Sequence, residues 1–132
     1  MRLRPRSISP ILAFALVKKW LGAVCRYNVN EILSFYSRDA VLLGTIAENI
    51  EMGAGIEGYF KKFVEKEPCG EVTSCFAQQL SKDILVANGT YIFRLMNTKG
   101  GIDEVNARFT FVFKEIGGVW KIKTQHSSEE PI

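Results

Sequence analysis

The carboxyl-terminal half of the chain constrains the fold most, because it consists of extended runs of β-branched and aromatic residues. These runs occupy positions 72–80, 84–96, 105–114 and 119–126. Short breaks that carry turn residues separate them, and the last break is a Gly-Gly pair. Four such runs in succession predict consecutive antiparallel strands that end in a hairpin.

The amino-terminal half has the periodicity of helices instead. Ser9-Pro10 is a suitable helix start, and apolar residues then recur every four positions: Leu12, Leu16, Trp20 and Val24. Shorter helical patterns follow from Asn28 to about Ser37 and over 56–64, with a short strand predicted between them. Helices followed by a meander predict an α+β fold, with a curved antiparallel sheet packed against three amino-terminal helices.

The length of 132 residues predicts a single domain. The charge of the chain is unevenly distributed along it. Five of the 17 basic residues lie before Trp20: Arg2, Arg4, Arg6, Lys18 and Lys19. We therefore divide the chain into a basic arm, residues 1–9, and one domain, residues 10–132. Because the domain lacks a basic face, we expect no nucleic-acid partner.

The first 17 residues have the outline of a signal peptide, but the apolar run is short and Lys18-Lys19 follows it without a cleavage site. No run reaches the length of a membrane span, so no membrane partner is expected. The three cysteines, Cys25, Cys69 and Cys75, have unrelated spacings that predict neither a metal site nor a disulfide. A cytoplasmic location is the simpler prediction, with secretion or a periplasmic location less favoured.

The only histidine of the chain, His126, lies on the second strand of the predicted hairpin. Strict alternation places it on the same face as Trp120, Ile122 and Thr124. Trp120, like Trp20, is predicted to belong to the core. An imidazole at the end of an inward-facing row could be the polar group of a pocket, or a structural histidine bonded to Ser128.

The turn length decides whether His126 meets Arg108, which alternates with the phenylalanines at 109, 111 and 113. A two-residue turn at Gly117-Gly118 would pair Phe109 with His126 and separate the two candidates. A three-residue loop, 116–118, would pair Arg108 with His126 instead. We favour the three-residue loop, which makes the phenylalanines an outer, dimer-forming face and lets Arg108 and His126 bind a carboxylate. Pairing of Arg108 with Glu104 or with a partner subunit is the alternative.

The sequence resembles the nuclear-transport-factor-two-like superfamily, and in particular the SnoaL-like proteins related to the association domain of calcium/calmodulin-dependent protein kinase II. The matching segments run in order from about Leu12 to the carboxyl terminus: Trp20, 35–45, 59–60, 89–93, 107–113, 118–122 and 126–128.

This resemblance implies a cone-shaped α+β barrel with a pocket between the helices and the sheet, and dimers formed through the outer sheet face. Functions of the superfamily range from association to isomerases and cyclases, so the fold does not choose among them. Many relatives carry a second histidine just before the position of His126, where this chain has Thr124-Gln125. No Asp or Glu lies inside a predicted strand after Glu71, which argues against a carboxylate base.

We therefore expect a small dimeric, pocket-containing module that binds a small anionic molecule, mediates association, or does both. The alternative is a SnoaL-type isomerase or cyclase with His126 as general base. No cofactor or metal is expected, and the partners are a second copy of the chain, in a dimer or a larger ring, and the unknown small molecule. The predicted ligand-binding residues are Arg108, His126, Tyr36, Tyr59, Tyr91 and, on weaker grounds, Arg94. Aromatic residues at such spacing are more often core, which is the alternative for the three tyrosines.

Overall fold

The computed structural model describes residues 8–45 and 47–131, so most of the predicted basic arm lies outside the described residues. The elements follow in this order: α1 (Ile8–Cys25), α2 (Val29–Ser34), β1 (Tyr36–Leu43), β2 (Ile50–Met52), α3 (Ala54–Phe63), a 3₁₀ turn η1 (Val64–Lys66), β3 (Cys69–Ser81), β4 (Ile84–Met96), β5 (Ile102–Ile116) and β6 (Val119–Glu129).

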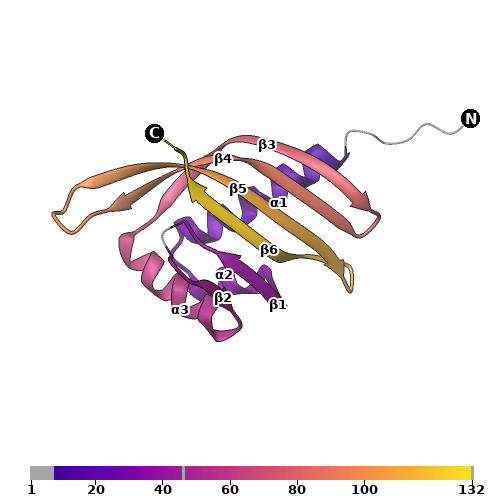
Figure 1. The fold of residues 1–132 in the computed structure, drawn as a ribbon, viewed down its shortest axis with the longest axis horizontal. Helices are drawn as coiled ribbons and strands as arrows, with labels where there is room; N and C mark the ends of the chain where they lie inside the picture. The colour runs from indigo at the N-terminus through magenta and orange to yellow at the C-terminus, as the bar shows by residue number, and fades with distance from the viewer. Residues whose placement is uncertain (1–7, 46, 132) are drawn as a thin grey trace, which may run out of the picture.

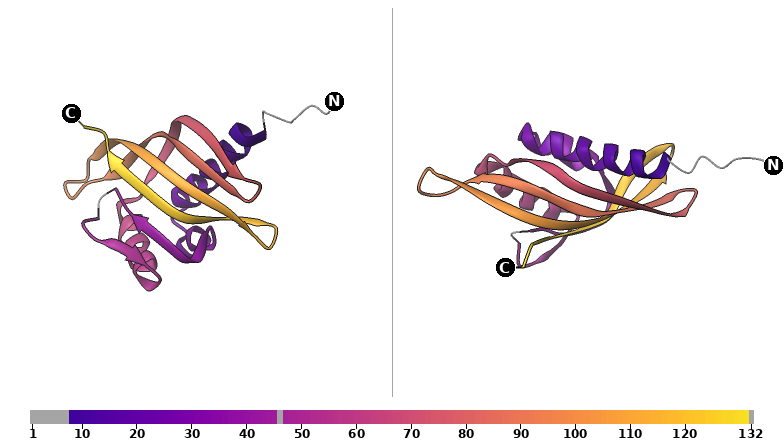
Figure 2. Two further views of the ribbon diagram at one scale, coloured as in Figure 1. Left: turned by 45° about the vertical axis from the view of Figure 1, so that its right-hand side comes forward. Right: turned by 90° about the horizontal axis from the view of Figure 1, so that it is seen from above.

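The strands form one curved sheet in the order β2-β1-β6-β5-β4-β3 (Figure 1). Strands β3 to β6 are the predicted antiparallel meander. Strand β1 pairs with β6 in parallel, which joins the first and last strands of the described chain. Figure 2 shows α1 lying along one face of the sheet, so the predicted α+β architecture is confirmed.

The helices bury the faces that the sequence periodicity predicts. On α1, Trp20 and Val24 are at most 2% exposed and lie in the core, and Leu12 and Leu16 are partly buried against it. Asn28 caps α2 by accepting a hydrogen bond from the Glu31 amide. This helix ends earlier than predicted because the chain at 36 is already held by pairing with β6.

The terminal hairpin has a two-residue turn, so the preferred three-residue loop is wrong. Gly117 and Gly118 both have positive φ angles, 58° and 83°, which glycine adopts without strain. Ile116 pairs with Val119, and the register then shifts at a bulge between the pairs Phe113–Ile122 and Val112–Thr124.

The two-residue turn and the bulge in β6 together decide which side chains of the hairpin face inward. Phe109, Phe111 and Phe113 are at most 4% exposed and lie in the core, not on the outer face that we expected. Burying large aromatic side chains stabilises the fold more than exposing them on a free surface. Beyond the bulge, Gln125 faces inward and His126 faces outward, the reverse of the predicted alternation.

Two further expectations need correction. Trp20 is in the core as predicted, whereas Trp120 is only partly buried at the edge of the core. Cys25 and Cys69 form a disulfide that joins the end of α1 to the start of β3, although we predicted none. The two cysteines are 44 residues apart, and only the packing of the helix brings them together. The cysteine argument for a reducing cytoplasm therefore no longer holds.

No helix among residues 8–45 and 47–131 combines the length and the apolar character needed to cross a membrane.

Candidate functional site

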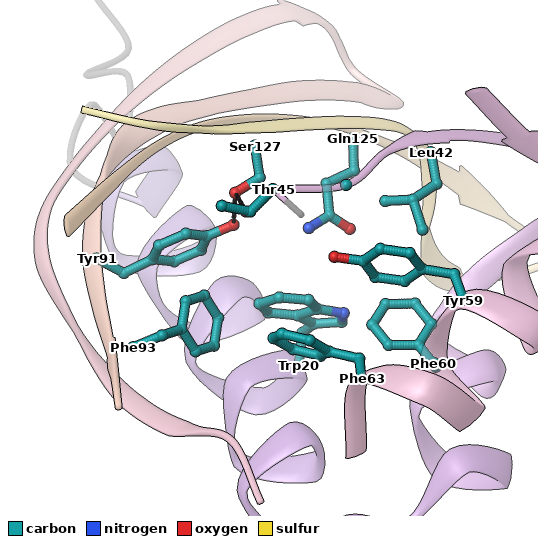
Figure 3. A pocket seen from close by; sticks show the side chains of 11 residues that line it. Trp20, Leu42, Thr45, Tyr59, Phe60, Phe63, Tyr91, Phe93, Gln125 and Ser127 are labelled. Carbon is teal, nitrogen blue, oxygen red and sulfur yellow. Dashed lines mark hydrogen bonds between the residues drawn. The ribbon is translucent and has the colours of Figure 1, made fainter. Parts of the chain in front are cut away.

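A small cavity lies between the helices and the inner face of the sheet (Figure 3). The space open to a water-sized sphere is about 10 Å³, which is about the room that one water molecule needs. Most of the lining is aromatic, and a polar edge comes from β6 and the end of β1. The lining residues are Trp20, Leu42, Gly44, Thr45, Tyr59, Phe60, Phe63, Tyr91, Phe93, Gln125 and Ser127.

Gln125 anchors the polar edge on one side of the cavity. The indole Nε1 of Trp20 donates a hydrogen bond to the Tyr36 hydroxyl at 3.0 Å. The Tyr36 hydroxyl in turn donates to Oε1 of Gln125. Gln125 is only 2% exposed, so its amide is fixed by partners from α1 and β1 and not by solvent.

Ser127 continues the polar edge on the other side. The Tyr91 hydroxyl on β4 donates to Oγ of Ser127 at 2.7 Å, and Ser127 also shares a hydrogen bond with the Thr45 hydroxyl. Both hydroxyl protons can rotate, so Ser127 and Thr45 can each donate or accept. Among the described residues, every buried side-chain nitrogen or oxygen has a hydrogen-bond partner.

The cavity is electrically neutral near pH 7. Burial raises the pKa of Tyr36 well above its ordinary value, against the lowering effect of the Trp20 hydrogen bond. Burial likewise raises the pKa of Tyr91, against the lowering effect of its hydrogen bonds with Ser127 and Gln125. The lining contains no carboxylate, imidazole, ammonium or guanidinium group among the described residues. No group of three His, Cys, Asp or Glu residues in the described part could hold a metal ion.

The structure brings the three predicted tyrosines together at the site. Tyr59 and Tyr91 line the cavity from opposite sides, with their hydroxyls toward its middle (Figure 3). Tyr36 does not line the cavity, but its hydroxyl donates a hydrogen bond to Gln125, which does.

The three predicted basic residues lie elsewhere. His126 pairs with Thr110 and Arg108 with Ser128, so the two candidates share the outer face but are not directly opposite each other. Both are exposed. Arg94 lies 3.5 Å from carboxylates of Glu71 and Glu104 at the surface. The expected inward placement of His126 and Arg108 is therefore wrong, because the bulge and the actual turn length set a different register.

Three polar residues of the site were not among the predicted site residues: Thr45, Gln125 and Ser127. Gln125 and Ser127 are two residues apart on β6, so the sequence predicts that their side chains point to the same face of the sheet. Their inward orientation depends on the bulge, and no feature of the sequence placed that bulge.

The family described as the SnoaL-like domain matches residues 14–132. A Xanthomonas campestris protein, described as a candidate calcium/calmodulin dependent protein kinase II association domain, is 31% identical, with a TM-score of 0.89 over 98% of this chain and 94% of that chain.

Two more distant structures share the fold. A ketosteroid isomerase-like protein from Erwinia carotovora atroseptica has 15% identity and a TM-score of 0.79, over 96% of this chain and 99% of that chain. A nuclear transport factor 2-like superfamily protein from Salmonella enterica has 12% identity and a TM-score of 0.82, over 96% and 94%. A search of curated proteins finds no match. The match over residues 14–132 and the 31% identity across nearly the whole chain establish that this protein belongs to the SnoaL-like domain family.

Proposed function

We propose that this protein is a small-molecule-binding module whose cavity takes a neutral ligand with one hydrogen-bonding group. The observation that carries the proposal is the polar edge formed by Thr45, Gln125 and Ser127 inside an otherwise aromatic cavity. An apolar cavity with a few convergent polar groups is the usual form of a small-molecule site. The rotatable hydroxyls of Thr45 and Ser127 suit a ligand carbonyl, amide or hydroxyl.

The neutral ligand replaces the anionic ligand that the sequence suggested. The anionic form depended on Arg108 as an anchor, and Arg108 lies on the opposite face of the sheet. An ion moved into this cavity would lose its hydration without gaining a charged partner among the described lining residues. A benzamide-like group avoids this cost because it is neutral, and its amide can both donate a hydrogen bond through N–H and accept one at the carbonyl oxygen.

We favour binding over catalysis because the described cavity lining holds no group that could act as a general base near neutral pH. A general base must lie within hydrogen-bonding reach of the proton that it removes. His126, the base of the enzymatic alternative, is on the outer face. The likeness to an isomerase-like structure at 15% identity concerns the fold and supplies no base to this cavity.

Self-association is the second part of the proposal, as a homodimer or a larger ring formed through the outer sheet face. The phenylalanines at 109, 111 and 113 no longer support it, because they are buried. The exposed aromatic side chain of that face is Phe76 on β3, 69% exposed, and it is the residue that association would cover. The related Xanthomonas protein is described as a candidate association domain, which agrees with this role.

Three ligands of nearly equal shape test the proposed pocket: neutral benzamide, anionic benzoate and cationic benzamidinium. We expect benzamide to raise the melting temperature in proportion to RT ln(1 + [L]/Kd), and the two ions to have much smaller effects. Gln125→Leu should abolish the benzamide effect, while Arg108→Ala should leave it unchanged. Stabilisation by benzoate that disappears in Arg108→Ala would instead favour an anion site on the outer face.

A further inference from the structure

Tyr59 separates the interior cavity from a second, larger space. This space is a groove of about 400 Å³ beside α3, and Tyr59 belongs to the lining of both. The groove residues are Ala47, Glu48, Asn49, Glu51, Gly55, Gly58, Tyr59 and Lys62. One side chain therefore borders both a space for about one water molecule and a space large enough for part of a ligand.

The ring of Tyr59 closes against a glycine at the end of β1. A Cβ atom built on Gly44 would lie 2.4 Å from both Cε1 and Cζ of Tyr59 and 2.6 Å from its hydroxyl oxygen. No side chain larger than hydrogen fits at position 44 while the ring keeps this place. Gly44 thus permits the closed position of Tyr59.

Two glycines of α3 line the groove: the Glu51 side chain lies close to Gly55, whereas the space above Gly58 is open. Gly55 and Gly58 are three residues apart and therefore neighbours on the helix surface. A Cβ atom built on Gly58 would meet nothing within 4 Å. Glycine is less favourable than alanine inside a helix, so Gly58 makes α3 less stable than alanine would. The absence of a side chain there leaves the space open. Gly58 and Tyr59 line the same groove.

We propose that Tyr59 is a gate, and that its movement joins the cavity and the groove into one elongated binding site. The ligand class is a neutral molecule whose hydrogen-bonding head lies at Gln125 and Ser127 and whose apolar body passes Tyr59 into the groove. This inference rests on the proposed binding function and adds the path, the length and the gating residue. It also explains how a cavity of about 10 Å³ admits a ligand, since opening the gate enlarges it.

Access of acrylamide, a small neutral amide, to Trp20 tests the gate without any assumed ligand. Trp20 is 2% exposed and lines the cavity. In a Trp120→Phe background only Trp20 fluoresces as an indole, and we expect its quenching to be weak. Tyr59→Ala and Gly44→Ala should each raise the quenching constant severalfold, because the first removes the ring and the second displaces it.

Two matched variants serve as controls for this measurement. Tyr59→Phe keeps the ring and should leave quenching low. Gly58→Ala adds the same methyl group as Gly44→Ala, but into open space, and should also leave quenching low. Thermal melting of each variant separates gate opening from unfolding. Unchanged quenching in a folded Tyr59→Ala protein would overturn the gate.

A series of benzamides with para-alkyl chains from methyl to butyl tests the elongated site. We expect binding to tighten about fourfold per methylene, the factor that corresponds to about 0.8 kcal/mol, as the chain enters the groove. Gly58→Leu fills the groove and should weaken the butyl compound while leaving benzamide itself unchanged.

The outcomes distinguish this inference from the function on which it rests. Benzamide binding without any dependence on chain length, or without any effect of Gly58→Leu on the butyl compound, overturns the elongated site and leaves the pocket function intact. If benzamide binds neither the parent protein nor Tyr59→Ala, the elongated site and the proposed binding function are both overturned.

Discussion

The inner and outer faces of β5 and β6 use polar side chains in opposite ways. On the inner face, Gln125 and Ser127 are 2% and 4% exposed and are held by hydrogen bonds to buried tyrosines. On the outer face, Arg108 and His126 are exposed to solvent. Charge is therefore kept out of the interior, and the interior retains neutral groups that can both donate and accept hydrogen bonds.

On β6, one backbone feature produces this difference. The bulge after Ile122 inserts a residue into β6, so Ile122 and Gln125 both face inward although they are three residues apart. Without the bulge, period-two alternation would place Thr124 and His126 inside. A single inserted residue thus decides whether the cavity holds a neutral amide or a titratable imidazole.

The largest expected effect comes from removing the aromatic centre of the inner face. Trp20 contacts the rings of Phe60, Tyr91, Phe93 and Phe111 and bonds to Tyr36. Trp20→Ala should lower the free energy of unfolding by about 3–5 kcal/mol, measured by chemical denaturation.

Trp120→Ala is the matched comparison, because Trp120 is only partly buried. Its cost should be about half as large or less, in proportion to the smaller area removed from water. Equal costs for the two substitutions would contradict the burial difference between the centre and the edge of the sheet.

The next effect concerns the polar groups of the inner face. Gln125→Leu keeps the approximate volume but removes the acceptor of the Tyr36 hydroxyl and a partner of Tyr91. Leaving buried polar groups without partners should cost about 1–3 kcal/mol of unfolding free energy.

The adjacent outer position provides the control for Gln125. The Thr124 hydroxyl donates to the Val41 carbonyl at 3.3 Å on the outer, half-buried side. Thr124→Val should change the free energy of unfolding by no more than about 0.5 kcal/mol. A larger cost for Thr124→Val than for Gln125→Leu would reverse the assignment of the two faces.

The sequence predicted those parts of the fold that follow from local periodicity. The apolar positions of α1, the Asn28 cap and the four long strands are all local patterns, and the structure has each of them. The recognition of the SnoaL-like family rested on several such segments in order, and the family match confirms it.

The parts that periodicity missed depend on contacts between distant segments. The parallel pairing joins β1 to β6, the first and last strands of the described residues. The disulfide joins Cys25 to Cys69, which are 44 residues apart in the sequence. The bulge breaks the alternation on which the placement of His126 depended. As a result the tyrosines of the site were predicted, whereas the arginine and histidine were placed on the wrong face.

The third effect appears only at alkaline pH and sharpens the contrast between buried and exposed phenols. The pKa values of Tyr36 and Tyr91 are raised by burial. Their contribution to stability is therefore fully present below the unfolded pKa of about 10 and is lost as the pH rises above it, by about 1.4 kcal/mol per pH unit for each phenol.

Denaturation at increasing pH, combined with the ultraviolet absorbance of tyrosinate, measures this effect. Both buried phenols should ionise only together with unfolding. Tyr91→Phe should reduce the slope of stability against pH above about pH 10. Ionisation of both buried phenols in the folded protein near pH 10 would contradict the closed, neutral interior.

The smallest effect on folding is expected on the outer face, where a substitution should change association instead. Phe76 lies on the edge strand β3, opposite Asn88, in a row that continues through Thr110 to His126. Because Phe76 is 69% exposed, Phe76→Ser removes little buried area and should alter the free energy of unfolding of the monomer by no more than about 0.5 kcal/mol. The same change should weaken the proposed dimer, since exposed aromatic side chains are the residues that association buries most effectively. Sedimentation velocity over a range of concentrations tests both statements, with the parent as a dimer or larger species and Phe76→Ser shifted toward the monomer. A parent protein that sediments as a monomer of 14.9 kDa at every concentration would remove association from the proposed function and leave only the cavity.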